Sequence, residues 1–374
     1  MIKRFVPIKK GYTTRIYPNN EQKESINKTI GSSRFVYNHF LDYSNKNNYE
    51  TYTKFCKLLT KLKKKYKWLK EVDSLALQQS LRDLDKAFKN FFKGQNNYPK
   101  FKSKKKARLS YRTQRFVRPG GTTNIKVKNN KIKLPKIGWI KFNKHQEIEG
   151  KIKNVTVSKK AGKYYISICL ENVLVQKVDY SKQNEIGIDL GLNDFAITSD
   201  GKKMENPKHL AKYEDKLAKL QRKLAKKEEG SNNWLKVKKK IQKLHKKIAD
   251  VRKDFLHKLS TQLTKENQLI AIEDLNIKGM LKNSKLAKHI SDVSWSKFTT
   301  MLEYKGKWYD CIIHQVNRFF ASSQTCNECG TKNPKVKDLS VRFWTCECGA
   351  NHDRDINASK NILNQAKKEL ALTN

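Results

Sequence analysis

Residues 185–200 have the sequence EIGIDLGLNDFAITSD, and this stretch decides the fold. It predicts two short strands, 185–192 and 194–200, closed by a turn at Asp200 and Gly201. Asp189 lies inside the first of these apolar strands. An ionised carboxylate in such surroundings costs free energy unless a cation or hydrogen-bond donors compensate it.

Two more carboxylates occupy comparable places further along the chain. Glu273 is embedded in the apolar run QLIAIEDL at 268–275, and Asp355 begins the helix predicted from HDRDINASKNIL at 352–363. One such residue alone is more often a satisfied structural group, but three in the order strand, strand, helix favour a shared role. Phosphodiester hydrolysis gives a reason, because two Mg²⁺ ions held by carboxylate oxygens can activate water and stabilise the leaving oxygen.

Carboxylates so far apart in sequence can converge only if their strands are neighbours in one sheet. The two-metal interpretation therefore predicts an RNase H-like α/β core, with the first strand central and the last helix packed against it. Asp194, Asp274 and Asp353 lie close in sequence to the three acids and are the nearest alternatives. Strand alternation turns Asp274 to the opposite face from Glu273.

Four of the seven cysteines form a second pattern, Cys326-x-x-Cys329-Gly and Cys346-x-Cys348-Gly. Two close pairs on tight turns predict a tetrahedral site for one structural Zn²⁺, with no open position for water. His352 is a less favoured alternative ligand, and nothing in the pattern supports a redox-active pair. The three remaining cysteines are interpreted as small core residues: Cys56, Cys169 and Cys311.

The charge balance indicates a polyanionic partner. The chain of 374 residues has 81 Lys and Arg against 35 Asp and Glu, a formal net charge of +46. Nucleic acid is the expected partner, because each neutralised phosphate releases counterions and adds affinity. A membrane surface is the alternative, but the sequence contains no run of 18 consecutive apolar residues and no signal peptide. We expect a cytoplasmic protein without a membrane partner.

The rest of the chain predicts an α+β protein of several domains. Residues 2–17 and about 123–178 show strand periodicity and predict a small antiparallel β-barrel, with 21–122 as a helical insertion. Helices are predicted at about 21–44, 75–92, 295–307 and 355–370, and a coiled-coil-like hairpin at 210–255. Irregular basic segments are predicted at 94–122 and 276–293.

These motifs resemble the TnpB family of transposon-encoded nucleases, which are related to miniature type V CRISPR effectors. The resemblance is carried by GIDLGLNDFAITSDG at 187–201, IAIEDLN at 270–276, and SSQTCNECG to FWTCECGANHDRDINASKNIL within 322–363. LALQQSLRDLDKAFKNFF at 75–92 and SSRFVYNHFLD at 32–42 add support. Three acidic motifs and a cysteine ribbon in this order make the match specific.

The resemblance implies a RuvC-type nuclease core with an inserted zinc ribbon, a wedge β-barrel and a helical recognition insertion. It further implies RNA-guided cleavage of double-stranded DNA beside a short motif, with a guide RNA from the transposon end. Asp189, Glu273 and Asp355 become the Mg²⁺-binding catalytic acids, and Cys326, Cys329, Cys346 and Cys348 the zinc ligands. The implied nucleic-acid contacts are Gln78, Gln79 and Arg354, although both glutamines also suit a solvent-exposed helix position.

The expected domain boundaries follow from the motifs and the resemblance together. They are 1–20 for the first strand of the wedge barrel, 21–122 for the helical recognition insertion, 123–183 for the rest of the barrel, 184–323 with 350–366 for the nuclease core, 324–349 for the zinc ribbon, and 367–374 for a tail. Two other functions stay open: a guided DNA-binding protein that does not cleave, and a transposase that transfers strands. A complete set of three acids argues against a protein that binds without cleaving. The position of the ribbon, between Glu273 and Asp355, argues against a transposase.

Overall fold

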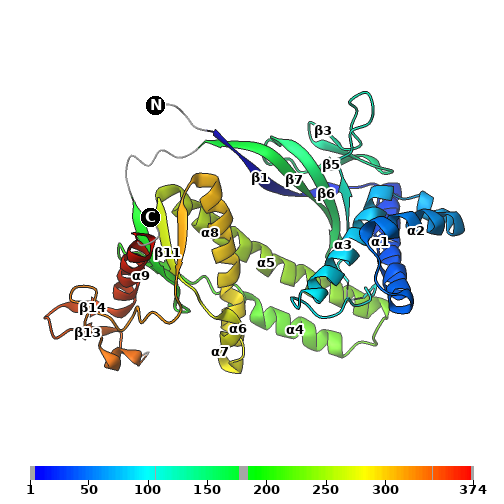
Figure 1. Ribbon diagram of the computed structural model, residues 1–374. Helices are drawn as coiled ribbons and strands as arrows, with labels where there is room; N and C mark the ends of the chain where they lie inside the picture. Colours follow the sequence, from blue (N-terminus) through cyan, green and yellow to red (C-terminus); the bar gives the residue numbers. More distant parts are fainter. Residues whose placement is uncertain (1–4, 106, 177–183, 339, 372–374) are drawn as a thin grey trace. The chain divides into compact units, whose positions relative to one another are not determined.

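The computed structural model describes residues 5–105, 107–176, 184–338 and 340–371 (Figure 1). Contacts divide the chain into two compact units, residues 6–174 and residues 175–374 together with 1–5. Both units combine helices with a sheet, so the chain is a mixed α/β protein. None of the helices within the described residues combines the length and apolar composition that crossing a bilayer requires.

The unit of residues 6–174 contains a seven-stranded antiparallel sheet in the order β2-β6-β7-β1-β5-β4-β3. The first strand of the chain joins strands that follow it by more than a hundred residues, as its periodicity predicts. The strands are β1 (Phe5–Tyr17), β2 (Ser110–Gln114), β3 (Lys126–Lys128), β4 (Lys131–Leu134), β5 (Gly138–Phe142), β6 (Lys151–Lys160) and β7 (Lys163–Gln176).

Three helices form a second core in this unit: α1 (Asn20–Asn47), α2 (Tyr52–Lys65) and α3 (Ser74–Phe92), with a short 3-10 turn at Lys67–Lys70. Asn19 starts α1 with a capping box, because its side chain accepts from the backbone of Gln22 and the Gln22 side chain accepts from the backbone of Asn19. Apolar stripes of the three helices pack on one another. Both α1 and α3 contact β2 at the edge of the sheet.

The other unit contains a five-stranded sheet in the order β10-β9-β8-β11-β12. Strands β8, β11 and β12 are parallel, and β9 and β10 run antiparallel to their neighbours. The strand predicted to be central, β8, does occupy the middle of the sheet. The bounds are β8 (Glu185–Asp189), β9 (Asp194–Thr198), β10 (Lys203–Glu205), β11 (Leu269–Glu273) and β12 (Ile312–Val316).

Helices cover both faces of this five-stranded sheet. On one face, isoleucines of β8 and β11 pack against α5 (Asn232–Glu266), α7 (Ser284–Val293) and α8 (Trp295–Tyr309). On the other face, Ala271 and Val316 pack against α9 (Arg354–Ala371). The last helix therefore packs on the sheet as predicted, next to β8 and β11 (Figure 1).

The predicted hairpin is also present, formed by α4 (Glu214–Ala225) and α5. Its seam is a cluster of buried leucines and isoleucines from both helices, with Tyr213 from the short turn Ala211–Tyr213 at its edge. Ser231 starts α5 by accepting a hydrogen bond of 3.2 Å from the backbone of Trp234. The 3-4 spacing of apolar residues was sufficient to predict this element because local contacts dominate it.

Three segments differ from the sequence-based expectation. Residues 110–114 form β2 instead of basic loop, and α2 has no counterpart among the predicted helices. The segment 276–293, predicted as an irregular connection, contains α6 (Ile277–Met280) and α7. Among its lysines are two core residues, Ile290 and Val293. The last helix ends at Ala371, close to its predicted end at about residue 370, and residues 372–374 lie outside the described residues.

Candidate active site and metal centre

The two acids carried by strands leave the same end of adjacent parallel strands. Strands β8 and β11 pair in register, with Ile188 opposite Ile272. The next residue on each strand is an acid, Asp189 on β8 and Glu273 on β11. Because paired positions of parallel strands point to the same face, these two side chains lie next to each other on one face of the sheet.

Gly187 shows how the third acid reaches this place. A Cβ atom on Gly187 would lie 1.9 Å from the backbone oxygen of Ser359 and 2.9 Å from the Cβ of Leu363, so α9 packs directly on β8. Asp189 shares the face of Gly187, two residues further along the strand. Asp355 precedes Ser359 by one helical turn and shares that side of α9. The first turn of α9 therefore lies over the end of β8.

The charges of Glu273 and Asp355 both act on the carboxyl group of Asp189. Burial, followed by the charges of Glu273 and Asp355, raises the pKa of Asp189 to about 8, and the charge of Arg354 opposes this shift. Burial also raises the pKa of Glu273, although the Ser322 hydroxyl donates a hydrogen bond to its Oε1. Carboxylates in this arrangement resist ionisation unless a cation compensates them. Their oxygens are the ligands that a hard divalent cation prefers.

The three neighbouring acids have other roles. Asp274 forms an ion pair with Arg318, whose Nε lies 3.0 Å from Oδ2. Asp353 pairs with Lys203 at 2.7 Å and caps α9 by accepting hydrogen bonds from two backbone N–H groups. Asp194 opens β9. None of these three is among the groups that shift the pKa of Asp189.

Two further side chains contact the acids, and no sequence pattern predicts them. Arg342 places Nη1 3.2 Å from Oδ2 of Asp355, and Ser322 donates to Glu273. Both residues belong to the segment between β12 and α9, which contains the cysteine cluster. They reach the acids only in the folded chain. In the sequence, Arg342 is one cation among many and has no distinguishing spacing.

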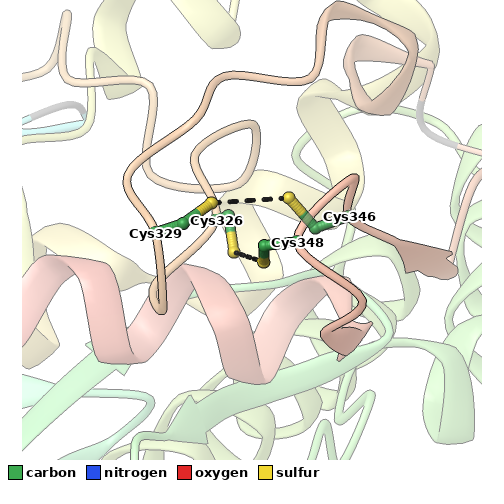
Figure 2. Close-up of side chains that lie close together, drawn as sticks. All are labelled: Cys326, Cys329, Cys346 and Cys348. Atoms are coloured by element: carbon green, nitrogen blue, oxygen red, sulfur yellow. Dashed lines mark hydrogen bonds between the residues drawn. The ribbon is translucent and has the colours of Figure 1, made fainter.

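The four clustered cysteines meet at one point. Their Sγ atoms all lie within 4.8 Å of one another, and no other group of described His, Cys, Asp and Glu residues brings its ligand atoms so close. Figure 2 shows the four side chains converging from two loops, with Sγ–Sγ distances of 3.8 Å for Cys326 and Cys348 and 3.6 Å for Cys329 and Cys346. A four-sulfur cluster of this kind suits a closed, tetrahedral metal site.

The glycines after each pair have the left-handed conformation that tight turns require, with φ of 79° at Gly330 and 88° at Gly349. His352 lies beside the cluster, with Nε2 3.0 Å from the Sγ of Cys326. An imidazole N–H at this place can donate a hydrogen bond to a metal-bound thiolate. Hydrogen bonding by Thr331 lowers the pKa of Cys329 to about 6, whereas the pKa of Cys346 is raised to about 12, so the metal-free cluster contains thiols as well as a thiolate.

The residues predicted to contact nucleic acid lie apart from these clusters or at their edge. Gln79 is only 7% exposed and accepts a hydrogen bond of 3.1 Å from Gln114, so the alternative of a solvent-exposed position is wrong for it. It lines a cavity of about 690 Å³ together with Arg34 and other residues. Gln78 is half-buried. Arg354 is buried and donates to the backbone oxygen of Asp338 at 3.4 Å.

Comparison with known proteins identifies the family. Residues 167–284 match a family described as "Probable transposase", residues 295–362 match "Cas12f1-like, TNB domain" and residues 7–54 match "Helix-turn-helix domain". The chain is 39% identical over 367 residues to a Streptomyces pristinaespiralis protein named "Putative RNA-guided DNA endonuclease", covering 95% of this chain and 89% of the relative. The chain belongs to the TnpB family.

Other matches agree with membership of the TnpB family. An Escherichia coli K12 protein, "Putative RNA-guided DNA endonuclease InsQ", is 34% identical over 372 residues, covering 93% of this chain and 90% of the relative. A solved structure titled "Cryo-EM structure of the Cas12f1-sgRNA-target DNA complex" aligns at 16% identity with a TM-score of 0.37, covering 96% of this chain and 99% of that chain. Its TM-score is too low to support an argument about this fold.

Proposed function

We propose that the chain is an RNA-guided endonuclease that cuts double-stranded DNA next to a short motif. The observation that carries this proposal is the position of Asp189, beside Glu273 on the adjacent strand and under the first turn of α9, where the charges of Glu273 and Asp355 both raise its pKa. The named functions of its relatives in the TnpB family point to the same reaction. The guide would be an RNA from the transposon end, paired with the target strand.

The acids would hold two Mg²⁺ ions, which supply an activated water and stabilise the leaving oxygen when bound. The protein's part is to position the ligands. The charges of Glu273 and Asp355 both act on Asp189, so its carboxylate would be the ligand that both metal sites have in common. Ser322 fixes the orientation of Glu273, and Arg342 holds the carboxylate of Asp355. A carboxylate with a raised pKa binds a proton in the absence of a cation and releases it when a cation binds.

Charge supports the guided mechanism over a compact, sequence-specific DNA binder. The net charge of +46 suits broad contacts with the backbones of a guide RNA and its DNA hybrid, whose sequence is read by base pairing. Gln78 and Gln79 would contact DNA beside the target, and Arg354 would stabilise a phosphate near the acids. The four cysteines would hold one structural Zn²⁺, because four thiolates leave no position open for water.

The same proposal assigns the architecture. The unit of residues 175–374 would be a RuvC-like, RNase H-type nuclease core, supported by the central β8 and by helices on both faces of its sheet. The seven-stranded sheet would be the wedge β-barrel, and α1 to α3 the recognition helices. The proposed limits remain 1–20, 21–122, 123–183, 184–323 with 350–366, 324–349 and 367–374.

The test is cleavage of a plasmid library in Mg²⁺ by protein purified with RNA transcribed from the end of its own transposon. The library carries the guide-matched target beside randomised flanking bases. Linear products with the matched target and a defined flanking motif, absent with a mismatched guide, support the proposal. Guide-dependent binding without cleavage would indicate the non-cutting protein instead. Strand-transfer products formed without a guide would indicate a transposase, which the description of one matching family suggests.

A further inference from the structure

Two phenylalanines are unusually exposed. Phe319 is 88% exposed and Phe343 is 75% exposed, the two highest values among the large hydrophobic side chains of the described residues. Scattered exposed apolar residues are common and need no explanation. Both of these, however, are aromatic and lie within a few residues of side chains that contact the proposed catalytic acids, Ser322 near Phe319 and Arg342 near Phe343.

Phe319 stands on a short, well-anchored loop after β12. On one side, Arg318 forms the ion pair with Asp274. On the other side, Ser322 donates to Glu273, and Phe320 packs on the α9 face of the core. The partners of these two side chains, Glu273 and Asp274, are consecutive residues at the end of β11. The loop is therefore fixed to the strand that carries an acid, and the Phe319 ring stays exposed.

The distance to the acid is short. Val316, the last residue of β12, pairs in register with Glu273. Phe319 follows Val316 by three positions in the chain, a contour of at most about 11 Å. The turn in which Phe320 donates to the backbone of Asn317 shortens that reach. Phe319 therefore lies at the edge of the acid cluster on its β12 side.

Phe343 occupies a matching position on the other side. It begins the short strand β13 (Phe343–Thr345), which pairs with β14 (Asn351–Asp353), and its partner in that ladder is Asp353. The preceding residue, Arg342, contacts Asp355. Phe343 thus flanks the acid contributed by α9, whereas Phe319 flanks the acid contributed by β11.

We propose that Phe319 and Phe343 are stacking platforms for bases of the single strand that enters the acid cluster. This inference rests on the proposed nuclease function and names how the site holds its substrate. A nucleobase is the occupant that suits an exposed ring in this place, because base–aromatic stacking tolerates any sequence. The neighbouring cations Arg318, Arg342 and Lys203 each already pair with a carboxylate. The net charge of +46 over the whole chain favours a polyanionic strand over a protein surface as the occupant.

The experiment compares variants that separate stacking from simple apolar contact. Phe319→Trp keeps a stacking face, Phe319→Leu keeps apolar area without one, and Phe319→Ala removes both. Phe343→Ala tests the second platform. Ile312→Ala is the matched control, because Ile312 is 50% exposed at the opposite end of β12, away from the acids. Phe319 is so exposed that its variants should melt at the temperature of the unchanged protein.

We expect Phe319→Ala and Phe319→Leu to weaken single-strand binding about 5- to 100-fold, measured as KM for guide-dependent cleavage of a strand with a preformed bubble. Phe319→Trp should stay within about threefold of the unchanged protein, as should Ile312→Ala. Phe343→Ala should also raise this KM, by a smaller factor than Phe319→Ala. A leucine variant equal to the phenylalanine protein would overturn the stacking assignment.

A second measurement does not depend on cleavage. A short single-stranded oligonucleotide containing 5-iodouracil is irradiated with the protein in Mg²⁺-free buffer, and the crosslinked peptides are identified by mass spectrometry. Crosslinks to Phe319 or Phe343 support stacking even if guided cleavage is never observed, so this outcome separates the two proposals. Crosslinks confined to other segments of the chain, together with unchanged cleavage by the alanine variants, would refute the inference.

Discussion

The acid cluster and the cysteine cluster are built in opposite ways. Asp189, Glu273 and Asp355 end or begin regular elements of the core, and their positions follow from strand register and the packing of α9. The four cysteines lie on two loops joined by very short strands, and the apolar cluster around them is small. In the first region the fold positions the three acids. In the second region a metal bound by the four cysteines would stabilise the fold.

This difference predicts opposite consequences for the loss of a ligand. Removing an acid relieves the cost of burying charged groups near one another, so the fold should tolerate it while the reaction is lost. Removing a cysteine withdraws the binding free energy that stabilises a segment with little core of its own. Function and stability should therefore separate cleanly between the two clusters.

The largest effect is expected for Asp189→Ala. Guide-dependent cleavage should fall by at least about a thousandfold, because one of the carboxylates that would hold the metal ions is lost. Binding of guide RNA and target DNA should remain within about twofold, and the melting temperature should stay the same or rise. Cleavage rate, filter binding and thermal melting measured on one preparation check this. Asp254→Ala is the control, since Asp254 is an exposed acid of α5 that pairs with Lys258 away from the cluster; equal losses in both variants would contradict the assignment.

The next effect is expected for Cys326→Ser. The variant should purify with less than one zinc per chain and lose stability or solubility, because a structural zinc site contributes folding free energy. Metal analysis and limited proteolysis of the segment 324–353 measure this. Cys311→Ser is the control, a cysteine buried in the core of the same unit and outside the cluster. A serine variant that folds and cuts normally would show that the cluster is not a structural zinc site.

The sequence points to Asp189 and Glu273 because each interrupts an apolar strand, whereas Asp355 begins a helix. A buried carboxylate in a strand is conspicuous in the sequence, and the order of elements then implies which strands are neighbours. The glycines that follow both cysteine pairs likewise predict the turns found at Gly330 and Gly349. These features depend on local sequence, so local sequence is enough to predict them.

Other features depend on contacts that no local pattern encodes. The strand β2 pairs with β6 across more than forty residues of chain, and its sequence SYRTQ resembles the basic loop around it. Helix α7 is lysine-rich, and only Ile290 and Val293 mark its buried side. The contact of Arg342 with Asp355 joins two elements that only the folded chain brings together. Tertiary packing, not propensity, decides these three cases.

Arg342 joins the two compared regions, and its loss should have an intermediate effect. Arg342→Ala should lower the rate of guided cleavage about tenfold, because the carboxylate of Asp355 loses the partner that orients it. Arg342→Lys should recover part of the rate, whereas zinc content should stay at one per chain in both. Lys337→Ala, which removes an exposed cation from the same loop region, is the control. A loss of zinc in Arg342→Ala would mean that the residue supports the ribbon instead of the acid.

The smallest expected effect is a pH dependence of stability that only the acid cluster should show. The pKa of Asp189 is raised to about 8 in the folded, magnesium-free protein, whereas the unfolded chain releases this proton near pH 4. Between these values the folded state holds a proton that the unfolded state has lost, so stability falls as pH rises. Asp189→Asn cannot titrate and should melt at a higher temperature than the unchanged protein at pH 7.5 with no added magnesium, while the difference vanishes near pH 4. The buffer should contain no chelator, so that bound zinc is retained.

Added Mg²⁺ should stabilise the unchanged protein more at pH 8 than at pH 6, because the ion binds the deprotonated carboxylates. An aspartate protein whose melting temperature follows that of the asparagine variant at every pH would mean that the three acids do not share one electrostatic site.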